Sequence, residues 1–278
     1  MFYLQRFVLE YHFRQAIASA FAMRLPQAPA AEDASRQAPG LAEQFRKSGV
    51  VVLPGLLTDT QVADIRTSLS TKPCAGDTIH KYYDLEDLLQ TPGIVELINH
   101  PLIVSVAQRV LGCKPTLSEV TAWWNYHDFD PVEGTRDHPF YTDRHLEYHR
   151  DIDDWMMVRV LIYLTDVTSE SGPHSYLKNT NRRNIPAFRG INLADPSYQS
   201  MLKDRLDITG KAGTVILMNP YGLHRGVVPK SADRLMLGYS FSLHPTYLSP
   251  ERPVVSLGPI QGCDPYVNRR FVSFSEVG

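Results

Sequence analysis

The chain has 278 residues, a mass of 31.4 kDa and a formal net charge of −2, with 43% hydrophobic and 21% charged residues. This composition is ordinary for a globular protein, and the near-neutral charge argues against nucleic-acid binding through a general basic field. No apolar run approaches the roughly 18 residues of a membrane span. The three cysteines lack zinc-type spacing, so reduced thiols and a cytoplasmic location are expected.

Two N-terminal segments precede the expected folded domain. Residues 1–25 are apolar with three arginines and predict a docked amphipathic helix, with a targeting segment as the alternative. Residues 26–40 are rich in Pro and Ala and predict a flexible connector. We therefore expect an N-terminal helix and connector over 1–40 and a single domain over 41–278.

The first part of that domain has helical signals. A short helix is predicted from Leu41 to Gly49, followed by a strand over 50–53. The segment Thr58–Gln61 is a capping box at the start of the next helix, and Pro101 opens a helix that Gly112 ends.

From Lys114 onward the apolar residues alternate instead, which is the period of strands. Strands are predicted over 117–125, 145–151, 156–164, 213–219 and 235–243. Short strands separated by Gly, Pro and Asp favour an antiparallel sandwich or barrel. The interval 165–212 is long and polar, so we expect it to include a mobile lid over a binding pocket.

The last predicted strand has two different faces. Arg234 shares one face with small residues such as Gly238 and Ser240, whereas the other face is apolar. An arginine among small residues suits the wall of a polar cavity, although an arginine facing solvent on an edge strand is the alternative. On strand 156–164, Arg159 and Tyr163 likewise share a face.

One histidine motif suggests a metal site. His149 and Asp151 are two residues apart, so on a strand both side chains leave the same face, and His224 lies 73 positions after Asp151. Two imidazoles and one carboxylate suit a non-haem Fe(II) that activates oxygen. His145 and Glu147 form a competing His-x-Glu with the same spacing, and a histidine at the surface or core edge remains the simpler alternative for His149.

Several further motifs occur in an order that resembles the phytanoyl-CoA dioxygenase-like branch of the Fe(II)/2-oxoglutarate-dependent oxygenases, over roughly residues 41–245. They are Phe45-x-x-x-Gly49 with the strand that follows it, His149-x-Asp151, Tyr163–Val167, Ser171–His174, Ala212–Val215, His224–Gly226 and Arg234. The resemblance implies a mainly β fold with flanking helices and a double-stranded β-helix, or jelly-roll, core.

The resemblance also implies roles for individual residues. His149, Asp151 and His224 are similar to the iron ligands of the family, and Arg234 to the residue that pairs with the distal carboxylate of 2-oxoglutarate. A guanidinium suits that role because its planar fork binds a carboxylate in a bidentate manner. The implied cofactors are Fe(II), 2-oxoglutarate as co-substrate and O2. The implied reaction is hydroxylation or desaturation of a small molecule, with succinate and CO2 as co-products.

Three positions distinguish this chain from parts of the family. Lys178–Asn181 replaces a usual Pro-Gly-Ser-His near the substrate entrance, and Gly226 stands where many relatives carry a hydroxyl beside the cofactor carboxylate. Asp151 is present, whereas related halogenases replace this ligand by a small residue. The resemblance therefore favours oxygen insertion or desaturation over halogenation.

The pocket itself is predicted less directly. Arg159, Tyr163, Trp155 and His174 are candidates for its lining, with a core position for Trp155 and a turn-capping role for His174 as alternatives. A small-molecule substrate is expected, and neither a nucleic acid nor a membrane. The alternatives to an oxygenase are a non-catalytic jelly roll that binds a ligand, and a zinc hydrolase built on the same three residues.

Overall fold

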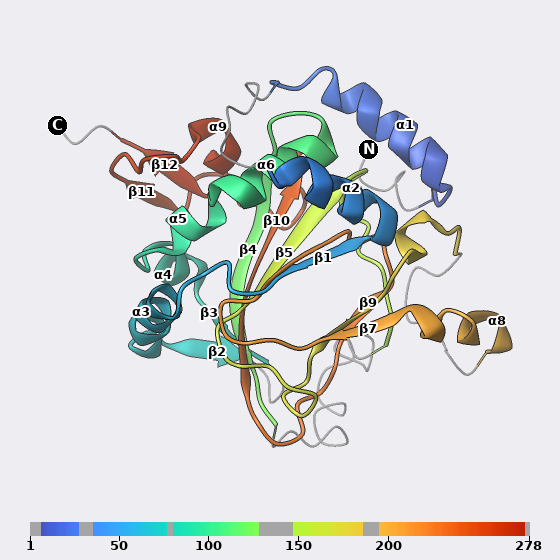
Figure 1. Cartoon of the computed structure of the whole chain (residues 1–278). Helices are drawn as coiled ribbons and strands as arrows, with labels where there is room; N and C mark the ends of the chain where they lie inside the picture. Colours follow the sequence, from blue (N-terminus) through green and yellow to red (C-terminus); the bar gives the residue numbers. More distant parts are fainter. Residues whose placement is uncertain (1–6, 28–35, 77–79, 128–146, 186–194, 276–278) are drawn as a thin grey trace.

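Two antiparallel sheets that face each other form the centre of the computed structural model, which describes residues 7–27, 36–76, 80–127, 147–185 and 195–275 (Figure 1). The larger sheet has the order β1-β8-β5-β10-β4-β3-β2, and the smaller has the order β7-β6-β9. Their strands are β1 (Val50–Leu53), β2 (Cys74–Gly76), β3 (His80–Tyr83), β4 (Thr116–Asn125), β5 (Met157–Tyr163), β6 (His174–Leu177), β7 (Arg205–Ile208), β8 (Val215–Met218), β9 (His224–Gly226) and β10 (Arg234–Ser242). The predicted jelly-roll class, mainly β with flanking helices, is confirmed.

Helices cover the outer face of the larger sheet, with α2 packing on both α6 and β1. In chain order the helices are α1 (Tyr11–Ala22), α2 (Ala38–Ser48), α3 (Asp59–Ser70), α4 (Leu85–Leu89), α5 (Ile94–Ile98), α6 (Pro101–Leu111), α8 (Pro196–Gln199) and α9 (Pro265–Asn268), with 3₁₀ turns η3 (Thr180–Arg182) and η4 (Leu202–Asp204). A parallel pair, β11 (Val255–Leu257) and β12 (Val272–Phe274), lies near the C-terminus. None of the described helices is both long and apolar enough to cross a membrane.

The two faces of β10 pack into two different apolar clusters. Leu235, Leu237 and Tyr239 belong to the large apolar cluster shared with the helices. Met236 instead belongs to the cluster between the two sheets, together with Tyr163 on β5. Successive side chains of a strand point to opposite faces, so one strand closes the helix-covered core and also lines the space between the sheets.

Local signals in the helical part are confirmed, whereas one strand prediction in the β part is wrong. The Thr58–Gln61 capping box is present, and Gly112 ends α6 in a left-handed conformation. The strand predicted over 145–151 is wrong for its described part, where only isolated bridges occur, because the backbone of Asp151 turns away to bond Pro220 O. The interval 165–212, where a lid is expected, supplies β6 and β7, and β6 is fully buried. Residues 145 and 146 of the predicted strand, 186–194 of the interval with the expected lid, and 28–35 of the connector lie outside the described residues.

A glycine joins helix α2 to the sandwich. Gly49 ends α2 with a φ of 82°, and a Cβ added there would lie 2.2 Å from the hydroxyl oxygen of Tyr176 on β6. The Gly49 carbonyl also accepts a hydrogen bond of 2.8 Å from the Asn219 amide. A side chain at this position would therefore combine backbone strain with a direct overlap.

We expect the substitution Gly49→Ala to lower the free energy of unfolding by at least about 2 kcal/mol, from the left-handed backbone and the overlap together. Urea denaturation measures this change. Gly40→Ala in the same helix is the matched control, because nothing lies within 4 Å of its added Cβ. That control should be neutral or stabilising by about 0.5–1 kcal/mol. Equal effects of the two substitutions would contradict the packing described here.

Candidate functional site

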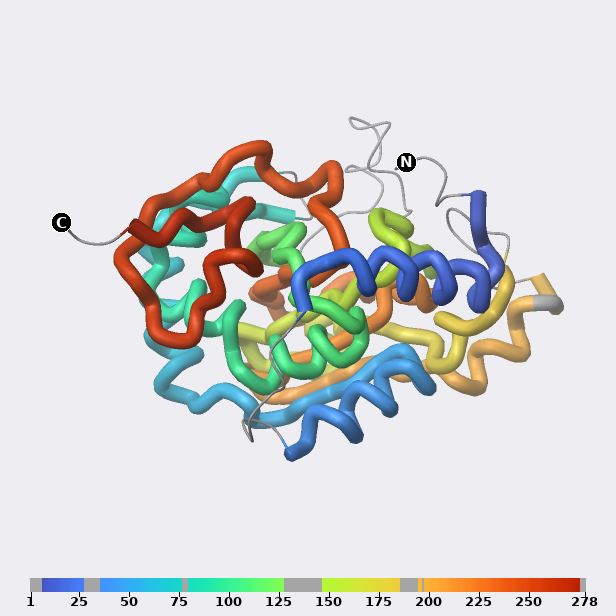
Figure 2. The backbone as a smooth tube through the Cα atoms, turned by 90° about the horizontal axis from the view of Figure 1, so that it is seen from above, coloured from blue at the N-terminus to red at the C-terminus, as the bar shows by residue number. Residues whose placement is uncertain are grey.

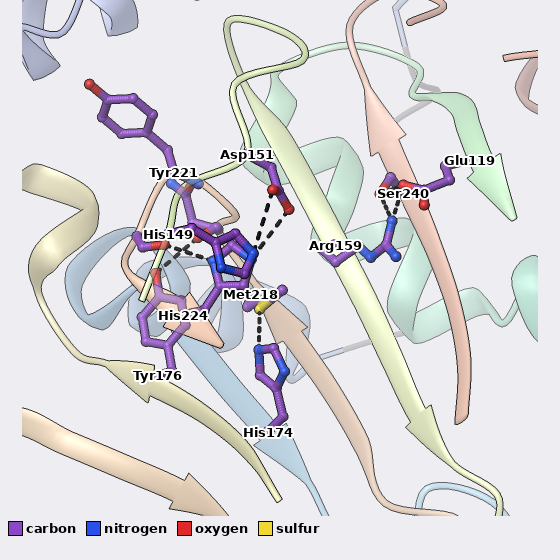
Figure 3. Close-up of polar contacts among 12 residues, drawn as sticks. Glu119, His149, Asp151, Arg159, His174, Tyr176, Met218, Tyr221, His224 and Ser240 are labelled. Atoms are coloured by element: carbon purple, nitrogen blue, oxygen red, sulfur yellow. Dashed lines mark hydrogen bonds and ion pairs between the residues drawn. The ribbon is translucent and has the colours of Figure 1, made fainter. Parts of the chain in front are cut away.

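Three side chains from two distant segments converge at one end of the space between the sheets (Figure 3). His149 and His224 lie side by side because their backbones exchange hydrogen bonds of 3.0 and 3.1 Å. The Asp151 amide donates to the carbonyl oxygen of Pro220 at 2.9 Å, which turns the Asp151 side chain toward both imidazoles. The candidate ligand atoms of His149, Asp151 and His224 all lie within 4.8 Å of one another.

Main-chain carbonyls fix the orientation of both imidazoles. His149 Nδ1 lies 2.9 Å from the Glu147 oxygen, and His224 Nδ1 lies 2.9 Å from the Gly222 oxygen. A carbonyl oxygen only accepts, so each Nδ1 carries the proton and each Nε2 is the ring nitrogen directed toward Asp151. The Nε2 atoms lie 3.8 Å and 3.3 Å from the two carboxylate oxygens of Asp151. Two imidazole nitrogens and a carboxylate are thus aimed at one point.

This donor set fits a divalent metal ion. Hydrogen bonds that fix the tautomer of ligand histidines are typical of metal sites, and two imidazoles with one carboxylate are typical of non-haem Fe(II) centres. Within the described ranges, no other group of three such residues lies close enough together to hold a metal. Of the competing pair, His145 lies outside the described residues, and the exposed Glu147 contributes its backbone carbonyl to His149.

A cavity of about 320 Å³ opens beside these residues. One wall is the inner face of the larger sheet, where β10 and β4 pair Arg234 with Asn125 at one end and Ser240 with Glu119 at the other. The six-residue separation along β10 corresponds to about 20 Å. The two ends of this wall therefore offer separate polar environments, one around Arg234 and one around Arg159 and Glu119.

Arg234 has an unsatisfied donor inside the protein. Its Nε and Nη2 donate to the Asn125 side-chain oxygen at 3.3 and 2.8 Å, whereas Nη1 is buried without a hydrogen-bond partner. Burial lowers the pKa of Arg234 to about 10, so the guanidinium remains charged at neutral pH. A buried, charged donor without an acceptor is costly. An anionic group bound in the cavity would satisfy it.

Arg159 lies on the same wall but already has a carboxylate partner. Its Nη1 donates to Glu119 Oε2 and, at 3.1 Å, to Ser240 Oγ (Figure 3). Burial lowers the pKa of Arg159 to about 10 as well. The two cavity arginines therefore differ in availability: the Arg159 charge is neutralised by Glu119, and that of Arg234 is not neutralised by Asn125, which is an amide.

Of the four residues predicted to line the pocket, Arg159 and His174 reach the cavity. His174 Nε2 lies 3.1 Å from Met218 Sδ, and its ring centroid lies 5.6 Å from that of His224. Burial and, secondarily, the neighbouring His224 hold the pKa of His174 well below its usual value, so the imidazole is neutral at pH 7.

The other two predicted lining residues, Tyr163 and Trp155, lie outside this cavity. Tyr163 is fully buried between the sheets, where its hydroxyl donates to Ile208 O at 2.6 Å and accepts from the His174 amide at 3.1 Å. Trp155 packs into the large core on the helix side and borders a different, much smaller pocket. The strand pattern alone did not show how far each side chain lies from the cavity.

Asn125 and Glu119 were missed from the sequence. Both lie on the same face of β4 as the cavity-facing Trp123, at even spacing along the strand. That alternation was visible, but the sequence did not show that β4 pairs with β10. The pairing makes Asn125 the neighbour of Arg234 and Glu119 the neighbour of Ser240.

A family model described as phytanoyl-CoA dioxygenase (PhyH) matches residues 45–234, which is more than half of the chain. The chain belongs to the phytanoyl-CoA dioxygenase family. The predicted family and the predicted enzyme class, an Fe(II)/2-oxoglutarate-dependent oxygenase, are thereby confirmed. The cofactors of this class, Fe(II) and 2-oxoglutarate, agree with the His-Asp-His donor set. No curated protein matches the chain in sequence.

Solved structures of other proteins share the fold of this phytanoyl-CoA dioxygenase family member. The non-haem α-ketoglutarate-dependent carbocyclase SnoK from nogalamycin biosynthesis is 20% identical, with a TM-score of 0.54 over 75% of this chain and 84% of its own. The epimerase SnoN, solved with Fe3+, α-ketoglutarate and nogalamycin RO, is 16% identical, with a TM-score of 0.54 over 74% and 83%. HygX from Streptomyces hygroscopicus, solved with nickel, 2-oxoglutarate and hygromycin B, is 20% identical, with a TM-score of 0.54 over 80% and 91%.

Replacing Asp151 by alanine should weaken binding of a divalent metal on the order of 100-fold or more, because it removes the only charged ligand of the group. Titration calorimetry with Co(II) or Mn(II) measures the dissociation constant. Glu147→Ala is the control, since it removes the competing carboxylate but leaves the carbonyl that holds His149. If Glu147→Ala abolished binding and Asp151→Ala did not, the metal would lie at the His145 and Glu147 pair.

Proposed function

We propose that this protein is an Fe(II)- and 2-oxoglutarate-dependent dioxygenase that hydroxylates or desaturates a small-molecule metabolite. The observation that carries the proposal is the buried Nη1 of Arg234, which lacks a partner in the same cavity that holds the three candidate metal ligands. A dicarboxylate that reached from a metal held by these ligands to Arg234 would supply the acceptor that this donor lacks. The family assignment is in agreement with this chemistry.

Each site residue has a role in this scheme. His149, Asp151 and His224 would hold Fe(II), and Arg234 would hold the distal carboxylate of 2-oxoglutarate, with Asn125 fixing its guanidinium. Bound iron with 2-oxoglutarate supplies the oxidising chemistry: O2 is consumed, 2-oxoglutarate yields succinate and CO2, and one oxygen atom is available for the substrate. Asp151 would occupy the ligand position that related halogenases leave to a halide.

The surrounding side chains favour a substrate with both apolar and polar parts. Trp123, Tyr82 and Leu161 line the cavity with apolar surface, and the ion pair of Arg159 with Glu119 offers donors and acceptors on its wall. A cavity of about 320 Å³ is in the range of small-molecule sites, which are roughly 300–1,000 Å³. HygX and SnoN were solved with the small molecules hygromycin B and nogalamycin RO, which supports a small-molecule substrate here.

Arg234→Met should raise the dissociation constant of 2-oxoglutarate by roughly ten- to a hundred-fold, the equivalent of about 1.5–3 kcal/mol for a charge-assisted pair. Arg234→Lys keeps the charge but loses the planar fork, so its effect should be intermediate. The measurement is an anaerobic 2-oxoglutarate titration of the Fe(II) protein, followed by its metal-to-ligand absorption band. Metal content should stay near that of the parent protein.

The double variant Arg159→Met with Glu119→Gln is the control for this titration, because it removes the other cavity guanidinium together with its carboxylate partner. It should bind 2-oxoglutarate with nearly the parental affinity. If Arg234→Met bound normally and the double variant did not, the co-substrate anchor would be Arg159. A parent protein that binds Fe(II) but forms no succinate from 2-oxoglutarate would support a non-catalytic ligand-binding role instead.

A further inference from the structure

The N-terminal helix α1 lies outside the family-matched region, yet it reaches the back of the metal site. The match begins at residue 45, whereas α1 covers Tyr11–Ala22. In Figure 2 the helix, drawn in dark blue, lies along the outer surface of the molecule. Its buried residues are Arg14, Ala18 and Ala22. A guanidinium is the one charged group that α1 inserts into the protein.

Arg14 binds the chain just after the carboxylate ligand. Its Nη2 donates to Asp154 O at 2.8 Å and to Trp155 O at 3.5 Å, and its Nη1 donates to Val8 O at 3.1 Å. Asp154 is three residues after Asp151, and its own carboxylate accepts from the amides of Leu243 and His244 at the end of β10. Arg14 therefore connects α1 to the segment that carries Asp151.

Arg14 also contacts the turn that carries His224. Its Cζ lies 4.5 Å from the ring centroid of Tyr221, and the Tyr221 hydroxyl donates to Leu9 O at 2.6 Å, immediately before α1. Tyr221 stands between Pro220, whose carbonyl accepts from the Asp151 amide, and Gly222, whose carbonyl orients the His224 ring. The same turn therefore positions two ligands, and α1 contacts it from behind.

A second buried guanidinium completes this arrangement. Arg150, adjacent to Asp151, places its Cζ 4.4 Å from the Tyr221 ring and donates to the Thr180 and Arg183 carbonyls at 2.8 Å each. Burial lowers the pKa of Arg14 to about 10, and it also lowers the pKa of Arg150. Burying cations is costly, and apolar side chains of similar size would often pack with less cost. The arrangement is therefore better explained by the geometry that it imposes than by stability alone.

We propose that Arg14 is a positioning residue of the metal centre, which holds the Asp151 segment and the turn before His224 in the orientation that binds the metal. The inference rests on the proposed function, because it assumes that His149, Asp151 and His224 bind the metal. Without Arg14, the carbonyls of Asp154 and Trp155 and one face of Tyr221 lose their common partner. Metal binding would then have to order the two ligand segments. Part of the binding free energy would be used for this ordering, so metal affinity would fall. In this account α1 is part of the oxygenase domain.

The test compares Arg14→Met and Arg14→Lys with Arg24→Met, an exposed arginine just after the same helix. Calorimetry gives the Co(II) dissociation constant, and the visible spectrum of the Co(II) protein reports on ligand geometry. We expect Arg14→Met to raise the dissociation constant roughly ten-fold, the lower limit for residues that act through a ligand, and to change the spectrum. Arg14→Lys should be intermediate, and Arg24→Met should equal the parent.

A purely structural role would be recognised by a different pattern. Leu69→Ala in α3, fully buried and outside the site, serves as the destabilised control, with the melting temperature of each metal-free variant measured in parallel. If Arg14→Met melted earlier, as Leu69→Ala should, but kept the parental Co(II) constant and spectrum, the inference would be overturned. Should Arg14→Met not fold, an unchanged constant for Arg14→Lys would overturn it. A parent protein that binds no Co(II) would contradict the proposed function itself, and this inference with it.

Discussion

The candidate site depends on one short piece of backbone pairing. His149 and His224 exchange two main-chain hydrogen bonds across 75 positions of sequence, and the Asp151 amide bonds Pro220 next to them. These main-chain bonds themselves bring the three candidate ligands together, so metal binding need not gather them from separate loops. Because both imidazoles are held through Nδ1 by carbonyls of their own segments, their orientation also follows from the backbone. Preorganisation of this kind favours metal binding.

The cavity contains two arginines, of which Arg234 is buried and Arg159 is partly buried. Arg159 is neutralised by Glu119, and Arg234 has only an amide partner and one unsatisfied nitrogen. Electrostatics therefore favours an anion at the Arg234 end and an uncharged polar group at the other. The order of side chains along β10 sets this division, since Arg234 and Ser240 lie at opposite ends of its inner face. In the proposed function, this strand would separate the co-substrate region from the substrate region.

Much of the fold and of the candidate metal site could be predicted from the sequence, because the local sequence signals were strong. The two faces of β10, the capping box at Thr58 and the three candidate ligands could all be recognised from spacing and from the family pattern. The strand expected over 145–151 was wrong, since the pattern of alternation cannot show that the Asp151 amide bonds the turn at Pro220. The role of Asn125 was missed for a similar reason: it depends on pairing between β4 and β10, which are more than 100 residues apart. Arg14 was passed over because a single arginine in an apolar helix is usually exposed.

The most direct test of the account is a crystal structure of the protein with Mn(II) and 2-oxoglutarate, prepared without oxygen. The account predicts one metal bound by the Nε2 atoms of His149 and His224 and by the carboxylate of Asp151. It also predicts the distal carboxylate of 2-oxoglutarate on the Nη1 atom of Arg234, with Arg159 still paired to Glu119. A metal bound elsewhere, or a co-substrate carboxylate on Arg159 with Arg234 Nη1 left unsatisfied, would contradict it.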